Sequence, residues 1–289
     1  MRKLPDDVVD EIREMIAGSL VEPHLDALLP AVRPAVSIRV DDEADDEPRI
    51  GGTHLRGAPD VPPGWQCPMR NGSPLALLAQ FDCAEFEAVD YFDQLPRAGV
   101  LSFFYDLEGR AWGDEPDARS AAIVQYFPDT SILHPADGNE PVDAFGMKLF
   151  QTWNLPSPGT RWFDRRFADV DEDERFTSYG RYLSDVVPEE VIPITGHRLL
   201  GYPRREQSGD LELECELRRC GLKGIDRANP AFDEVDRAAD DWILLAQFEY
   251  DDQRLTGEKY GDGLIYYFIR QQDLRERDFS RTQFFFEVS

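Results

Sequence analysis

Two stretches of the chain, far apart in the sequence, repeat nearly the same words. Residues 77–82 read LLAQFD and are followed at 99–105 by GVLSFFY. Residues 244–249 read LLAQFE and are followed at 263–269 by GLIYYFI. The order and spacing of the words are almost unchanged between the copies. This recurrence predicts an internally duplicated unit, in which each copy supplies two neighbouring strands.

A single polar side chain interrupts each LLAQF stretch, at Gln80 and Gln247. Alternate residues of a strand point to opposite faces, so both faces of these strands are otherwise apolar and are expected to be buried. A buried amide requires hydrogen-bond partners. Two interpretations stay open: the glutamines bond to nearby backbone, or they face a pocket at the junction of the copies together with Asp82 and Glu249.

The composition allows a large core and gives the chain an acidic surface. Apolar residues make up 42% of the 289 residues, which excludes wholesale disorder. The net charge of −26 disfavours nucleic acid and anionic membranes as partners, and it favours cations or a basic protein. The same charge also serves plain solubility.

Apolar spacing predicts helices over residues 6–20 and 22–29, followed by a half-buried strand over 36–40 and an acidic loop over 41–47. Beyond this point the pattern is one of short apolar runs between Gly and Pro. The expected strands are 75–81, 99–105, 121–127, 147–153, 211–217, 242–250, 263–270 and 283–288.

The alternation of apolar residues with glutamate over 211–217 predicts a one-sided strand with Cys215 on its apolar face. We therefore expect an α+β fold that is β-rich, with largely antiparallel sheets built from an internally duplicated unit and with an N-terminal helical segment. The expected organisation is a helical segment and strand over 1–47 and a domain over 48–289. Its two related halves cover about 48–155 and 190–289.

The stretch between the halves, residues 155–173, contains Trp162, Phe163 and Phe167, so we expect it to pack on the body of the protein. A weaker correspondence pairs the Ile-Gly-Gly of 50–52 with the Leu-Leu-Gly of 199–201. That pairing places an insertion in the second half, over residues 220–241.

Words in both halves resemble those of the YwqG-like bacterial proteins. The matching words are, in order, VPPGW (61–65), GSPL (72–75), LAQ (78–80), GVLSFF (99–104), HRLLGYP (197–203), GDGLIYYFI (261–269) and the stretch 273–280. The resemblance covers about residues 48–289. One departure is the turn over 53–58, which delays the proline that usually follows the paired glycines.

The resemblance implies a fold and no established reaction, because that family is a domain of unknown function. Such domains are sometimes encountered beside secreted toxins, so the resemblance also implies an immunity role as a hypothesis. The family association by itself does not establish a function.

No catalytic or metal-binding signature is present in the sequence. The histidines lack an HxH or HExxH spacing, and no GxSxG word marks a nucleophile. The cysteines lack a CxxC spacing and are expected to be free thiols. We therefore assign no catalytic residue, metal or cofactor from the sequence.

A candidate cleft can nevertheless be assembled from polar residues of the repeated words and of the distinctive HRLLGYP word. It comprises Gln80, Gln247, His197, Tyr202, Gln207 and Asp262. The alternative interpretation is that HRLLGYP is a strand that ends in a tight turn, and that Asp262 serves to make a turn.

The chain has no apolar run long enough for a signal peptide or a membrane span, which predicts a cytoplasmic protein. The function expected first is a non-enzymatic protein-interaction module, such as an immunity-type inhibitor of a basic toxin. The rival is a small-molecule or carbohydrate-binding protein, or an enzyme, with a cleft between the halves. A purely structural role is the third class.

Overall fold

The structure is a computed structural model of the chain. It describes residues 3–45, 48–89, 91, 93–113, 120–137, 142–171, 173–175, 185–186, 196–205, 207, 209–256 and 263–288.

One large antiparallel sheet dominates these residues, which confirms the β-rich and largely antiparallel prediction. Its hydrogen-bonded order is β15 (Gln283–Val288), β14 (Gly263–Arg270), β13 (Trp242–Glu249), β12 (Arg198–Leu200), β1 (Arg33–Asp45), β10 (Ala144–Asn154), β2 (His54–Arg56), β6 (Ala76–Asp82), β7 (Val100–Tyr105) and β8 (Ala122–Phe127), and β11 (Asp185–Val186) pairs with β10. Two short pairs lie outside it: β3 (Asp60–Val61) with β9 (His134–Pro135), and β4 (Met69–Arg70) with β5 (Ser73–Pro74).

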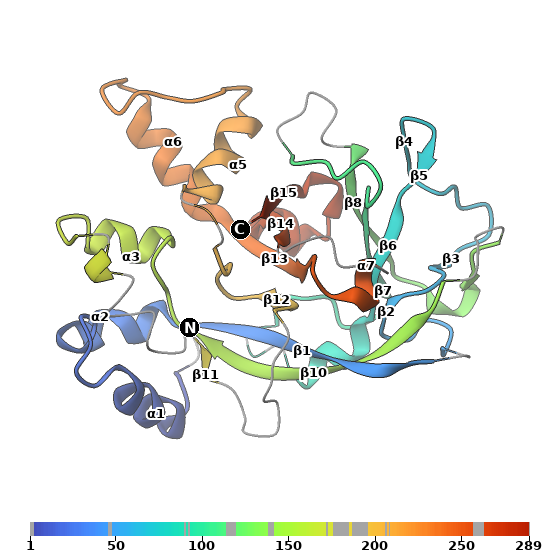
Figure 1. Ribbon diagram of the computed structural model, residues 1–289, viewed down its shortest axis with the longest axis horizontal. Coiled ribbons are helices and arrows are strands. Elements are labelled where there is room, and N and C mark those ends of the chain that lie inside the picture. Colours follow the sequence, from blue (N-terminus) through green and yellow to red (C-terminus); the bar gives the residue numbers. More distant parts are fainter. Residues whose placement is uncertain are drawn as a thin grey trace.

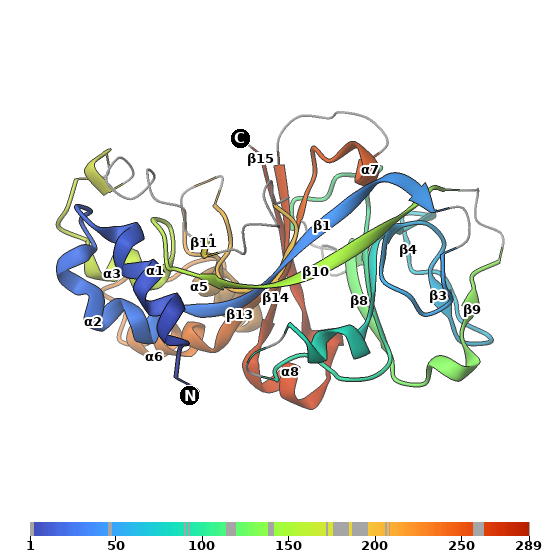
Figure 2. The ribbon, with the colours of Figure 1, turned by 90° about the horizontal axis from the view of Figure 1, so that it is seen from below.

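The long strands β1 and β10 form the centre of this sheet and run across the molecule (Figures 1 and 2). On one side of this pair lie β2, β6, β7 and β8, which we call the first arm. On the other side lie β12, β13, β14 and β15, which we call the second arm. The order of strands outward from the centre is thus the same in both arms.

The pairing register also agrees between the arms. The register shifts between Leu77 and Ala79 where β6 pairs with β7, and between Leu244 and Ala246 where β13 pairs with β14. These positions are equivalent in the two LLAQF words, so each arm carries an irregularity at the same residue of the repeat. A bulge of this kind is a built-in feature of a strand pair.

Each arm also has a left-handed residue pair at the end of its innermost strand. The φ angles are 59° at Arg56 and 77° at Gly57 in the first arm, and 61° at Leu200 and 76° at Gly201 in the second. A Cβ at Gly57 would lie 2.7 Å from the Cβ of Ala144, so the backbone must approach closely there.

At Gly201 the same Cβ would lie 2.8 Å from the Cβ of Ala35, on the other central strand. The structural counterpart of residues 199–201 is therefore the stretch 55–57. The sequence-based pairing with residues 50–52 instead matched a glycine turn that precedes β2, whereas Leu55 and Leu199 pair with the equivalent residues Ala79 and Ala246.

The two arms face each other and share one apolar core. The Phe103 ring of the first arm lies 5.4 Å from Phe248 and 5.2 Å from Tyr267 of the second arm, in edge-to-face contacts between ring centroids. The Tyr267 hydroxyl donates a hydrogen bond of 2.8 Å to the carbonyl of Phe104. All of these side chains are fully buried, so the facing sides of the two arms form one interior.

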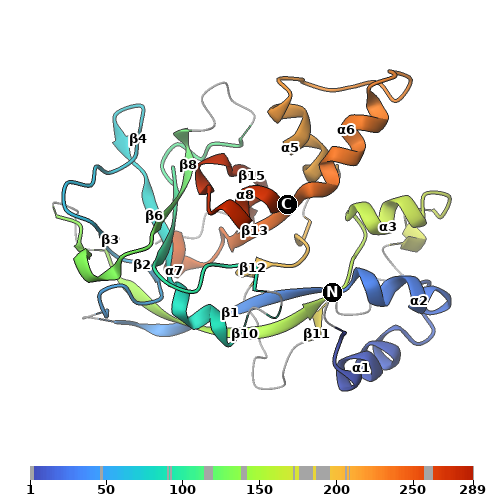
Figure 3. The same cartoon turned by 180° about the vertical axis from the view of Figure 1, so that it is seen from behind.

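Helices α1, α2, α3, α5 and α6 gather at one end of the molecule, away from β3, β4 and β5, whereas α7 lies beside β2 (Figures 1 and 3). The α-helices are α1 (Asp6–Ile16), α2 (Leu25–Leu28), α3 (Arg161–Arg166), α5 (Leu211–Arg219), α6 (Phe232–Ala238), α7 (Gln253–Thr256) and α8 (Gln271–Glu276). The 3-10 helices are η1 (Glu22–His24), η2 (Leu29–Ala31), η3 (Cys83–Glu87), η5 (Thr130–Ile132), η7 (Ala239–Asp241) and η8 (Phe279–Arg281).

The stretch 155–173 packs on the body, as its aromatic residues predict. Phe163 and Phe167, in and just after α3, are buried in one cluster with Ile12 and Ile16 of α1. The N-terminal helices thus have their own small core, and β1 leads from it into the centre of the sheet.

The strand predicted over residues 211–217 is wrong, because this stretch is helix α5. Its start is capped by Asp210, whose carboxylate accepts a 2.8 Å hydrogen bond from the amide of Leu213. Its end is followed by Gly221 with a φ of 72°. Leu211 and Cys215, four residues apart, are both buried, so the apolar pattern fits a helix face as well as a strand face.

Two further expectations need correction around β1. Residues 41–45 of the expected acidic loop are part of the strand, and 46–47 lie outside the described residues. The strand is also not half-buried at Ser37, which is 2% exposed and whose hydroxyl lies 3.2 Å from that of Thr152. A pair of hydroxyl groups can satisfy each other, so a polar residue does not mark a solvent face here.

Candidate functional site

The two repeated glutamines bond to backbone in their own arms. Gln80 is fully buried, and its Oε1 accepts a 2.8 Å hydrogen bond from the amide of Asp60. Its Nε2 donates to the carbonyl of Gly52 at 3.1 Å and to Oδ2 of Asp60 at 2.7 Å. This bonding holds the loop after β2 against β6.

Gln247 does the same work in the second arm. Its Oε1 accepts a 2.8 Å hydrogen bond from the amide of Arg204, and its Nε2 donates to the carbonyl of Gly196 at 2.7 Å. The side chain is fully buried. Of the two interpretations offered by the sequence, internal bonding is the one that the contacts match.

His197 is also sealed inside the second arm. Its Nδ1 accepts a 3.0 Å hydrogen bond from the amide of Glu249, so the neutral ring carries its proton on Nε2. Nε2 lies 2.9 Å from Oδ2 of Asp252. Burial favours the neutral acid, but hydrogen bonds from His197 and Arg254 outweigh burial and hold the pKa of Asp252 well below its usual range. The dyad therefore ties β12 to the segment after β13.

The remaining predicted cleft residues are separated. Gln207 is exposed, and it donates from its amide to Glu287 at 3.3 Å and from Nε2 to the carbonyl of Val288 at 2.9 Å. Asp262 lies outside the described residues. The cleft predicted from the sequence is therefore not assembled by the described residues, because its members are buried in different arms or lie at the surface. Tyr202 alone among them lines a large cavity.

That cavity has a volume of about 740 Å³ and lies between the N-terminal helical part, α3, α5 and the second arm. It is formed by residues from seven separate stretches of the chain. Its lining includes Ala27, Pro30, Ala31, Val32, Arg33, Pro34, Asp93, Gln94, Arg161, Trp162, Arg165, Leu200, Gly201, Tyr202, Glu212, Asp240, Trp242, Ile243, Leu244, Gln271, Leu274 and Arg275.

Tyr202 is a fixed part of the wall. Its hydroxyl donates a 2.7 Å hydrogen bond to the carbonyl of Ala31, and its amide donates to the side chain of Asn154. The guanidinium of Arg33 lies over the ring, 4.0 Å from its centroid. The strand β1 and the turn after β12 are thereby locked together at the cavity.

Glu212, in the first turn of α5, brings a buried carboxylate to the cavity. The residue is 4% exposed, and no other described residue donates a hydrogen bond to it. Burial is the main cause that raises the pKa of Glu212, and the nearby Asp210 adds to it, whereas Arg33 opposes it. A buried carboxyl group without a protein partner is costly, and such groups cluster at functional sites.

Arg33 faces the same cavity and is also incompletely partnered. Its Nη1 is buried and makes no hydrogen bond with a described residue, and Arg33 forms no ion pair with Glu212 there. The cavity therefore holds two groups of opposite charge that do not touch.

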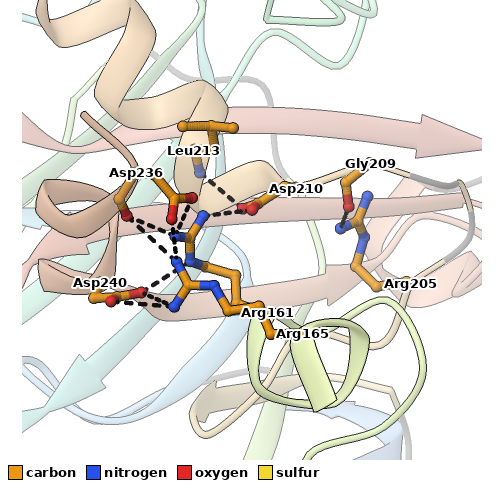
Figure 4. A network of polar contacts seen from close by, with 8 residues as sticks. All are labelled: Arg161, Arg165, Arg205, Gly209, Asp210, Leu213, Asp236 and Asp240. Atoms are coloured by element: carbon orange, nitrogen blue, oxygen red, sulfur yellow. Dashed lines mark hydrogen bonds and ion pairs between the residues drawn. The ribbon is translucent and has the colours of Figure 1, made fainter. Parts of the chain in front are cut away.

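Three further charged residues of the lining, Arg161, Arg165 and Asp240, belong to a network of ion pairs (Figure 4). Arg161, which is buried, donates from Nε to Asp240 at 3.0 Å, from Nη2 to Asp236 at 2.8 Å, and from Nη1 to Asp210. Arg165 donates to Asp236 at 2.9 Å and to Asp240 at 3.1 Å. The network fixes α3 to α5, α6 and η7 beside the cavity.

No sequence motif marks Arg33, Glu212 or Trp242. The available signals were indirect: Asp210 as a helix cap would have revealed α5, and the aromatic residues of 155–173 indicated a packed segment. The lining is assembled by tertiary contacts between distant segments, so no local spacing could mark it.

The described parts of the chain hold neither a metal-binding cluster nor a membrane-spanning helix. They contain no group of three or more His, Cys, Asp or Glu residues placed to hold a metal ion. No helix described there combines the length and apolarity needed to cross a bilayer. The cysteines are free thiols as predicted, and burial raises the pKa of Cys83 to about 12, which leaves it unreactive.

A family model described as a domain of unknown function, DUF1963, matches residues 53–287. No curated protein matches the chain significantly. Because the match covers most of the 289 residues, the chain belongs to the DUF1963 family.

Proposed function

We propose that this member of the DUF1963 family is a small-molecule-binding protein whose ligand occupies the cavity beside α3 and α5. The observation that carries the proposal is the buried carboxylate of Glu212 at the cavity, to which its own backbone amide is the only hydrogen-bond donor among the described residues. A volume of about 740 Å³ lies within the range of small-molecule sites, and Tyr202, Trp162 and Trp242 provide the apolar walls that such sites use.

The test is ligand binding to the wild-type protein and to a variant whose cavity is filled. A chemically diverse fragment set is screened by thermal shift, and hits are measured by calorimetry. In Ala27→Trp, an indole enters the cavity from α2, so we expect bound fragments to lose at least tenfold in affinity. Ala84→Trp, on exposed η3 in the first arm, is the control and keeps wild-type affinity. Fragments that bind Ala27→Trp as tightly as wild type would contradict the proposal, as would the absence of any saturable ligand.

A second candidate function rests on the net charge of −26. The acidic surface suits a basic protein partner, with the protein acting in the cytoplasm as an immunity-type inhibitor of a toxin. Affinity capture with co-encoded basic proteins tests this function: binding that weakens steeply with salt supports it, and no binding at low salt removes it.

We also infer that the two arms descend from one duplicated unit and that the chain is one of the YwqG-like bacterial proteins. The repeated words support the duplication, as do the shared strand order, the two register shifts and the two left-handed pairs at Arg56-Gly57 and Leu200-Gly201. The equivalent bonds of Gln80 and Gln247 support it further.

A further inference from the structure

The charged residues of the cavity restrict the kind of molecule that it can hold. The carboxylate of Glu212 accepts a hydrogen bond from its own backbone amide but from no other described residue, and Nη1 of Arg33 lacks an acceptor within the described residues. The two side chains sense each other electrostatically and yet form no ion pair. Each would gain a partner from a molecule that carries a donor and an acceptor, both charged, a short distance apart.

Two other charged residues of the lining, Asp93 and Arg275, are exposed to solvent, and the two arginines of α3 that line the cavity are already occupied. All three nitrogen positions of the Arg161 guanidinium donate to carboxylates, those of Asp210, Asp236 and Asp240. Arg165 bonds to the same last two residues. Arg161 and Arg165 are therefore not available to a ligand, which leaves Glu212 and Arg33 as the lining residues whose charged groups are buried and have no ion-pair partner among the described residues.

The apolar side of the cavity lies next to these two groups. Tyr202 stacks on Arg33, and Trp242 is 2% exposed at the start of β13. Ile243 and Leu244 continue this wall along the strand. An apolar or aromatic side chain of a ligand would be desolvated against these residues while its charged groups bind at the other side.

We propose that the cavity binds a zwitterion of the amino-acid type, with its ammonium group at Glu212, its carboxylate at Arg33 and its side chain against Tyr202 and Trp242. This inference rests on the proposed function, since it names the ligand class of the same site. Opposite charges placed at fixed positions select against molecules that carry only one of them, because such a ligand leaves a buried group unpaired.

The experiment uses the full chain and matched probes. The twenty common L-amino acids are screened by calorimetry. The tightest binder is then compared with the amine that lacks its carboxylate and with the acid that lacks its amino group. We expect each single-charge analogue to bind at least tenfold more weakly than the amino acid.

Two variants assign the charges. Glu212→Gln is expected to weaken binding of the amino acid and the amine at least tenfold and to leave the acid unchanged. Arg33→Met is expected to weaken the amino acid and the acid and to leave the amine unchanged. One control is Glu214→Gln on the exposed side of α5. The other is Arg39→Met, which removes a different guanidinium of β1 that also lies over an aromatic ring, that of Phe150.

The outcomes separate the two proposals. If fragments excluded by Ala27→Trp bind but no amino acid does, the zwitterion assignment is overturned and small-molecule binding stands. Equal affinity of the amino acid and its deaminated acid, unaffected by Glu212→Gln, also overturns the assignment. If neither fragments nor amino acids bind, both proposals fail. Circular dichroism of each variant establishes that a loss of binding does not come from a loss of folding.

Discussion

The two arms of the sheet have the same order of strands, but different elements pack on their outer faces. In the first arm, the outer face at Leu75, Leu77 and Phe104 is covered by the loop that carries Trp65, whose indole donates a 2.8 Å hydrogen bond to Gln125. In the second arm, the corresponding face is covered by α5, which buries Leu211 and Cys215 against β13, β14 and β15. A loop seals the first face, whereas a helix leaves a cavity at its margin.

The difference shows which positions serve the fold and which serve the site. Gln80 and Gln247 are repeated, and both fix backbone. Two residues that define the cavity differ from the first arm: Glu212 has no repeat counterpart, and Tyr202 replaces a smaller residue. Following the left-handed pair, Tyr202 stands where the first arm has Ala58. The candidate site therefore lies where the arms diverge.

The largest expected effect comes from the core that the arms share. Phe103→Ala removes a fully buried ring that contacts Phe81, Phe248 and Tyr267, so we expect a loss of about 3–5 kcal/mol in unfolding free energy. Urea unfolding followed by circular dichroism and tryptophan fluorescence should give coincident transitions, because both arms lose the same contacts. Two separate transitions would mean that the arms are independent units.

The next test compares the two glutamines directly. Gln80→Leu leaves the amide of Asp60, the carbonyl of Gly52 and a carboxylate oxygen without their partner, whereas Gln247→Leu leaves one amide and one carbonyl. Since a buried polar group left unsatisfied costs about 1–3 kcal/mol, we expect about 3 kcal/mol or more for Gln80→Leu and about 2 kcal/mol for Gln247→Leu. A lower urea midpoint for Gln247→Leu than for Gln80→Leu would contradict the expectation that the loss grows with the number of hydrogen bonds removed.

A smaller effect is expected for the network found beside the second arm. Arg161→Met removes a buried guanidinium from three carboxylates that are partly exposed, so we expect a loss of about 2 kcal/mol, below the full effect of breaking a buried pair. Arg165 is half-exposed and bonds to two of the same carboxylates, so Arg165→Met should cost less than about 1 kcal/mol. Thermal unfolding of both variants measures the difference, and equal losses would show that burial of Arg161 contributes nothing.

The smallest effect is a pH dependence at Glu212. Burial raises the pKa of this carboxyl above its ordinary value of 4.5, so the folded protein holds the proton more tightly than the unfolded chain. The resulting stability is present below pH 4.5 and is lost as pH rises through the raised pKa. Glu212→Gln should therefore melt at a higher temperature than wild type at pH 8 and at the same temperature near pH 4. Glu214→Gln is the control, and a pH-independent difference for Glu212→Gln would contradict the buried-carboxyl interpretation.

The repeated strands could be predicted well from the sequence, because strands that are buried on both faces consist of continuous apolar runs. β6, β7, β13 and β14 coincide with the repeated words to within a residue or two. It misassigned α5 because alternating leucine and glutamate also places Leu211 and Cys215 on one helical face, and only the cap at Asp210 separates the two possibilities. The cavity could not be predicted from the sequence, because Arg33 and Glu212 line it together only after β1 has paired with β12 and α5 has packed on β13.

The central position of β1 has a consequence for synthesis. This strand leaves the ribosome before every strand with which it pairs, and its neighbours β10 and β12 emerge only after the whole first arm. The first arm can hydrogen-bond within itself meanwhile, but Val36, Ile38 and Val40 of the nascent chain have no native cover until residues 144–154 arrive. During translation, the apolar strand β1 therefore exposes unpaired backbone edges for a time, and such edges are sites where chaperones can bind.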